Sequence, residues 1–189
     1  LANPNLPDAQ RKALQETYYI LTTSEASTNL SRFDGIRYGH RSTTANTLEA
    51  TYKQSRAEGF GNEVKKRIML GTFALSADYH DAYFTKAQQV RRLIRNSADS
   101  IFAGYDFLLM PTTPGTAFPI GEKTREPLAM YYADIFTVWA NLAGVCAISI
   151  PAGKDSNGLP IGIQAHANAF DEQRLLMFAA ESLEEKALN

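Results

Sequence analysis

Apolar residues recur at helical spacing through most of the first hundred residues. Val64, Ile68 and Gly71 lie along one side of a predicted helix, while Met69 and Phe73 lie along the other. Apolar residues on both sides indicate a helix that is buried on both sides. The predicted helices cover residues 16–31, 47–56, 62–77, 80–102, 135–142 and 171–186.

The second half of the chain adds three short apolar runs, at residues 105–110, 145–150 and 161–165. Runs of this length that stop at proline or turn residues are typical of buried strands. Asp155 to Gly158 forms a turn signal, so we expect the second and third strands to be antiparallel. Helices followed by strands among helices predict an α/β fold. Its sheet is incomplete, because three short strands cannot cover so much apolar helix surface.

Composition narrows the class of protein. Hydrophobic residues make up 44% and charged residues 21%, which excludes intrinsic disorder as the default. The net charge of -1 argues against a protein that binds nucleic acid by bulk electrostatics. We therefore expect a solvated face where one predicted helix carries three arginines, Arg91, Arg92 and Arg95.

The single cysteine and the ends of the chain bear on location. Cys146 cannot form an internal disulfide, which favours a reducing, cytoplasmic compartment. No apolar stretch reaches the roughly 18 residues of a membrane span. The 189-residue chain begins at Leu1 without an initiator methionine or a signal-peptide pattern, and we expect it to be part of a longer protein.

The residues alone contain no complete catalytic site. Gly59 and Gly61 lack the third glycine and the preceding strand of a phosphate-binding loop. His40, His80 and His166 show no metal-ligand spacing, and each is expected to lie at the surface or to be locally hydrogen-bonded. Cys146 lies in an apolar run, where a thiol behaves as a small hydrophobic group rather than as a nucleophile.

Two charged residues stand out against apolar surroundings. Arg67 follows Val64 by three residues, at the edge of the apolar stripe. Such an arginine has either an anionic ligand, a structural salt bridge, or a side chain that reaches out to solvent. Asp134 either caps the helix that starts at Ile135 or faces a cation across a pocket. The pattern alone leaves the alternatives open for both residues.

Several segments together resemble the C-terminal part of the amidase signature family, and within it the glutaminase subunits of tRNA-dependent amidotransferases. The match covers nearly all of residues 17–185, whereas residues 1–16 form a poorly matching lead-in. The segments are residues 18–20, 24–39, 58–61, 63–72, 81–83, 111–114, 141–144, 149–151 and 158–162. The resemblance implies that residues 17–189 are the C-terminal part of one amidase domain, with a mixed β-sheet flanked by helices.

The resemblance also implies glutaminase chemistry. Family members use a Ser–cis-Ser–Lys triad on a Gly/Ser-rich segment that this sequence lacks, so no catalytic residue is expected in this chain. For the substrate, the family pattern implies that Arg67 binds the α-carboxylate of glutamine and that Asp134 binds its α-amino group. It also implies that Tyr18 lines the pocket, a role that the adjacent Tyr19 could fill instead. No metal site is expected.

The implied parent enzyme is a glutamine-hydrolysing glutaminyl-tRNA synthase. It passes ammonia from glutamine to partner subunits B and C. There, Glu-tRNA(Gln) or Asp-tRNA(Asn) is amidated with ATP and Mg. The tRNA is contacted mainly through a partner subunit. The isolated chain is expected to be inactive. Two alternatives stay open: a fragment of a stand-alone amidase, and a non-catalytic assembly module.

Overall fold

A computed structural model describes residues 8–122 and 133–187 of the chain. The chain separates into two compact units. Thr17–Gln88 forms the first, which we call the helical unit. Gln89–Asn189 together with Leu1–Glu16 forms the second, which we call the sheet unit. Each unit is described by itself.

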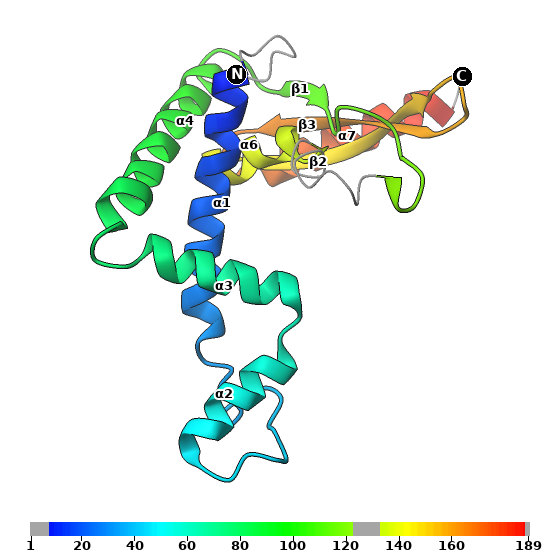
Figure 1. The fold of residues 1–189 in the computed structure, drawn as a ribbon. Helices are drawn as coiled ribbons and strands as arrows, with labels where there is room; N and C mark the ends of the chain where they lie inside the picture. The colour runs from blue at the N-terminus through cyan, green and yellow to red at the C-terminus, as the bar shows by residue number, and fades with distance from the viewer. Residues whose placement is uncertain (1–7, 123–132, 188–189) are drawn as a thin grey trace. The chain divides into compact units, whose positions relative to one another are not determined.

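The helical unit contains most of α1 (Asp8–Leu30), followed by α2 (Leu48–Gly59), α3 (Asn62–Ala74) and a short π-helix, η1 (Asp81–Thr85) (Figure 1). Helix α1 begins about two turns earlier than the predicted start at residue 16, so residues 8–15 are helical as well.

Helices α2 and α3 begin in different ways. The Thr47 hydroxyl accepts a hydrogen bond from the backbone N–H of Ala50, which confirms Thr47 as the N-cap of α2. Gly61 occupies the N-cap position of α3 and makes no side-chain cap bond.

Helices α1 and α3 make close backbone contact at Gly71. A Cβ atom at this position would lie 2.0 Å from the Thr23 carbonyl oxygen, so only glycine fits. One residue further along, the Thr72 hydroxyl hydrogen-bonds to that of Ser27 at 2.9 Å. The glycine thus fixes which turns of the two helices meet.

A loop between α1 and α2 is organised by the buried carboxylate of Asp34. It accepts hydrogen bonds from the backbone N–H groups of Ile36 and Arg37 and from Arg37 Nε at 2.9 Å. The backbone N–H of Arg37, followed by that of Ile36, lowers the pKa of Asp34 to about 2. Gly35 has a φ of 79°, which lets the chain turn tightly here.

The sheet unit holds three antiparallel strands in the order β1-β3-β2: β1 (Leu108–Pro111), β2 (Cys146–Lys154) and β3 (Pro160–Ala167). The predicted antiparallel pairing of the second and third runs is confirmed, with Ile150 opposite Ile163. Among the described residues, β1 and β2 are each paired on one side only. The α/β class and the partial sheet are as predicted.

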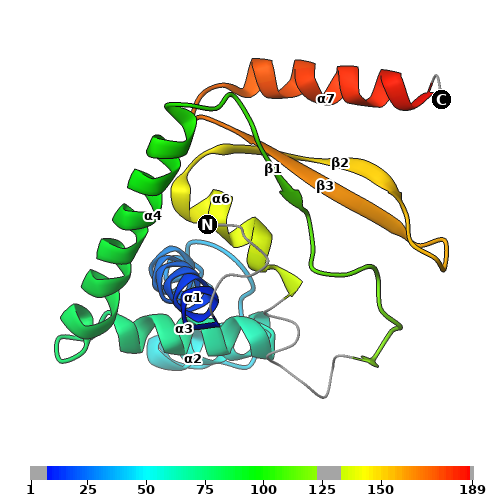
Figure 2. The same ribbon diagram turned by 90° about the horizontal axis from the view of Figure 1, so that it is seen from above.

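Helices cover both faces of this sheet (Figure 2). Helix α7 (Glu172–Ala187) packs Leu175 and Ala179 against Ile150 and Ala165, which form the centre of the apolar core. Helix α6 (Ile135–Ala143) lies on the opposite face, and six of its nine residues are buried. None of the helices in the described ranges is long and apolar enough to cross a membrane.

Helix α4 (Lys86–Phe102) carries the arginines that were expected to form a solvated face. Arg91 Nε donates to the Leu142 carbonyl at 3.2 Å, and Arg95 donates to the carbonyl of Ala143 at 2.9 Å. These carbonyls belong to the last turn of α6, where they lack partners within the helix. Arg91 is exposed as predicted and Arg95 is half-buried, and both also stabilise the C-terminus of α6 through these bonds.

Candidate functional site

Arg67 lies on α3 with its guanidinium held at two points. Its Nε donates to Glu63 Oε1 at 3.1 Å, one turn earlier on the same helix. Its guanidinium carbon lies 5.6 Å from the centre of the Tyr19 ring on α1. Among the described residues, neither terminal nitrogen of Arg67 has a hydrogen-bond partner, and 38% of the side chain is exposed. Arg67 therefore makes the structural ion pair that the sequence left open, and its two terminal nitrogens keep their hydrogen-bonding capacity within the described part of the chain.

Tyr18 and Tyr19 are adjacent on α1, and both are half-buried. The structure places the ring of Tyr19 against Arg67. The Tyr18 backbone carbonyl accepts a hydrogen bond from the Thr22 hydroxyl at 2.8 Å. The role of Tyr18 in lining a substrate pocket stays a prediction.

Asp134 stands directly before Ile135, the first residue of α6, where a capping aspartate would be expected. Its side chain makes no cap hydrogen bond and is exposed. The carboxylate is thus available to an external cation. Asp134 belongs to the sheet unit and Arg67 to the helical unit, so their meeting across one substrate also stays a prediction.

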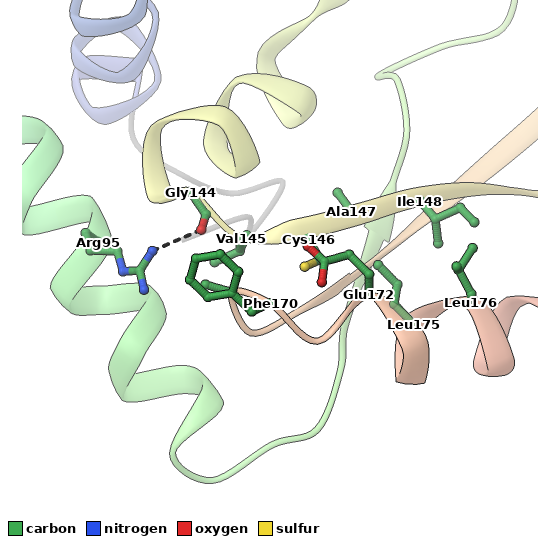
Figure 3. Close-up of a pocket in the computed structure, with 11 residues that line it drawn as sticks. Arg95, Gly144, Val145, Cys146, Ala147, Ile148, Phe170, Glu172, Leu175 and Leu176 are labelled. Atoms are coloured by element: carbon green, nitrogen blue, oxygen red, sulfur yellow. Dashed lines mark hydrogen bonds between the residues drawn. The ribbon is translucent and has the colours of Figure 1, made fainter.

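A groove of about 490 Å³ runs beside β2 in the sheet unit (Figure 3). It is lined mainly by apolar side chains, with Cys146, Glu172 and Arg95 as its polar or reactive groups. Burial raises the pKa of the Cys146 thiol, and the nearby Glu172 carboxylate raises it further. The thiol therefore stays protonated at neutral pH, which agrees with its expected role as a small hydrophobic group.

The three histidines have different surroundings. His40 Nε2 lies 2.7 Å from a carboxylate oxygen of Glu58, and His80 Nδ1 lies 3.3 Å from one of Asp81, so both are locally bonded as expected. His166 is fully buried, and neither ring nitrogen has a hydrogen-bond partner within the described part of the chain. The expectation of a surface or locally bonded histidine is wrong for His166.

The strand alternation of β3 explains this burial. Ala165 and Ala167 face α7, so His166 between them points to the other face. There its ring packs edge-on against Trp139 of α6, with 5.2 Å between ring centres. Sequence reasoning missed this position because the predicted third strand stopped one residue short of His166. An extension of that strand by two residues would have placed the histidine on a buried face.

Comparison with known proteins identifies the family. The model of the family described as Amidase matches residues 3–176, and the chain belongs to this family. The A subunit of glutamyl-tRNA(Gln) amidotransferase from Bacillus cereus (strain AH187) is 56% identical to the chain over 163 residues. This match covers 86% of the chain but 34% of the relative, so the chain spans about a third of the length of that protein.

Solved structures agree on the fold. A structure described as that of an amidase aligns with a TM-score of 0.61 and 22% identity, over 88% of this chain and 34% of its own. A structure from work on a vestigial protein complex and the origins of an s-triazine catabolic enzyme aligns with a TM-score of 0.65 and 21% identity, over 93% of this chain and 34% of its own. At this level of identity, the likeness concerns the fold alone.

Proposed function

We propose that this chain forms the glutamine-binding portion of the glutaminase subunit of a tRNA-dependent amidotransferase. The 56% identity to the Bacillus cereus relative supports the class of enzyme. The terminal nitrogens of Arg67, unpartnered within the described ranges, are the observation that carries the binding role. In this proposal Arg67 binds the α-carboxylate of glutamine, Asp134 binds its α-ammonium group and Tyr18 lines the pocket.

The proposed ligand explains why two opposite charges are needed. Glutamine is a zwitterion, so its recognition requires one fixed cation and one fixed anion, and the planar fork of arginine matches a carboxylate. A stand-alone amidase that acts on an uncharged amide has no use for both groups. The exposed carboxylate of Asp134, free of any cap bond, favours the amino-acid substrate.

The remaining chemistry is proposed to lie outside this chain. A Ser–cis-Ser–Lys triad in the rest of the glutaminase would release ammonia from the bound glutamine. Partner subunits B and C would use that ammonia, with ATP and Mg, to amidate Glu-tRNA(Gln) or Asp-tRNA(Asn) in the cytoplasm. This chain alone should release no ammonia from glutamine, because binding groups without a nucleophile and base leave the barrier to amide cleavage almost unchanged.

Substitution of Arg67 by alanine tests this function. A hybrid enzyme joins this chain to the part of the Bacillus cereus relative that lies outside the match, and is assembled with the partners of that relative. A charge-assisted contact contributes about 1.5–3 kcal/mol, so Arg67→Ala should raise the KM for glutamine roughly 10- to 150-fold with little change in kcat.

Ammonia supplied in place of glutamine is the internal control. Turnover with ammonia should survive in Arg67→Ala, since ammonia bypasses the glutamine pocket. Equal loss of both activities would show that Arg67 is structural. An unchanged KM for glutamine would remove it from the binding site.

A further inference from the structure

The surroundings of Arg67 show how its guanidinium is oriented. Tyr19 precedes Thr23 by one turn of α1, and Arg67 precedes Gly71 by one turn of α3. The helices are in close backbone contact at Thr23 and Gly71, and the long Arg67 side chain spans from α3 to the Tyr19 ring on α1, with 5.6 Å between the guanidinium carbon and the ring centre. The position of the ring thus follows from the packing of the two helices.

Glu63 supplies the second point of attachment. It lies four residues before Arg67 on α3, the order of charges that an α-helix favours, and its carboxylate accepts from Nε. Both side chains are substantially exposed, 55% for Glu63 and 38% for Arg67. An ion pair this exposed contributes little to folding stability. The contact does set the direction of Arg67 Nε, which points at the Glu63 carboxylate.

We propose that Glu63 and Tyr19 are positioning residues that orient Arg67 for end-on binding of a carboxylate. This inference rests on the proposed function. With Nε occupied by Glu63, the side edge of the guanidinium is closed, and a carboxylate reaches only the edge formed by the two terminal nitrogens. The Tyr19 ring restrains the plane from one side. The site therefore accepts the α-carboxylate of an amino acid through two parallel hydrogen bonds.

A spectroscopic experiment tests the orientation without any need for activity, on the 189-residue chain in complex with the remaining part of the Bacillus cereus relative. The Arg67 Nε–H resonance is followed in 15N-labelled protein. Glu63→Ala should shift this resonance and speed its exchange with water, whereas Glu63→Gln, which keeps an acceptor oxygen, should retain much of the protection. Glu49→Ala is the matched control, because Glu49 forms an exposed i,i+4 pair with Lys53 in the first turn of α2. An Arg67 resonance that Glu63→Ala leaves unchanged would overturn the proposal.

Kinetics of the hybrid enzyme test the consequence for substrate. Glu63→Ala and Tyr19→Leu should each raise the KM for glutamine about three- to tenfold with kcat within twofold. Glu63→Gln and Tyr19→Phe should largely restore it, and Glu49→Ala should have no effect. Ammonia-dependent turnover should stay constant throughout.

The two proposals fail in different ways. If Arg67→Ala raises the KM for glutamine while Glu63→Ala and Tyr19→Leu leave it unchanged, the positioning inference is wrong and the proposed function stands. If Arg67→Ala leaves the KM unchanged, the glutamine site itself is wrong. In that case the Arg67 resonance still reports whether Glu63 orients the guanidinium.

Discussion

The carboxylate of Asp134 has two candidate roles that a single substitution separates. Asn caps a helix about as well as Asp, so Asp134→Asn removes the charge and keeps the capping capacity. Since no cap bond is present, we expect the thermal midpoint to change little and the KM for glutamine to rise roughly tenfold or more in the hybrid enzyme. Thermal unfolding and glutamine kinetics are measured on the same variant. An unchanged KM would exclude Asp134 from the site.

His166 makes stability depend on pH. Burial lowers the pKa of His166 to about 4, against an ordinary value of 6.5. Between these values the unfolded chain binds the proton and the folded chain does not. The free energy of unfolding therefore falls as the pH is lowered from 6.5 to about 4, by roughly 3 kcal/mol at most.

Substitution of His166 by leucine should remove that dependence. The leucine side chain leaves no unpaired ring nitrogen beside Trp139, so we expect equal or greater stability at pH 7, by about 1 kcal/mol. Denaturant unfolding at about pH 7 and pH 5 measures both effects. His80→Gln, at a half-buried histidine, should leave the pH dependence of the free energy of unfolding in place. If the free energy of unfolding still falls with decreasing pH in His166→Leu, other groups cause the pH dependence.

At the scale of elements, the contact of α1 with α3 depends on one glycine. Gly71→Ala would place a methyl group 2.0 Å from the Thr23 carbonyl oxygen, and the helices must move apart. We expect a loss of about 1–3 kcal/mol in the free energy of unfolding, although alanine favours the helix itself. The Arg67 Nε–H resonance should also change, because Tyr19 moves with α1. Gly104→Ala, where no atom lies within 4 Å, is the control and should be nearly neutral.

The elements themselves were largely predictable from local pattern. Apolar periodicity predicts helices α2, α6 and α7, and a turn signal predicts the pairing of β2 with β3. The extension of α1 to Asp8 and the π-helical turn at Asp81–Thr85 were missed, because the first residues are polar and a π-turn has no distinct apolar period.

The contacts between elements were not predictable in the same way. Arg91 and Arg95 appear on the polar side of α4 in sequence, and only the tertiary position of the α6 C-terminus gives them acceptors. The same limit applies to the candidate site. Periodicity placed Arg67 at the edge of an apolar stripe, but which aromatic ring meets it depends on the close approach at Gly71.

At the scale of the whole molecule, the sheet unit has apolar surface that its own helices leave uncovered. Leu109, Ile161, Ile163 and Leu176 are exposed, and β1 and β2 are unpaired on their outer sides within the described ranges. Unpaired strand edges and exposed apolar patches promote association. The chain also spans only about a third of the Bacillus cereus relative, which leaves a large part of that protein available to cover such surface.

We therefore expect the isolated chain to form dimers or larger aggregates as its concentration rises. The remaining part of the Bacillus cereus relative can be added as a separate polypeptide. This addition should raise the thermal midpoint and shift the chain into a defined complex. The reason is that paired strand edges and covered apolar side chains remove the surface that drives self-association. Sedimentation across a concentration series, with and without the added polypeptide, measures both. A monomer at every concentration that binds no apolar dye would show that these 189 residues close their own core, and that the partial sheet needs no further strands.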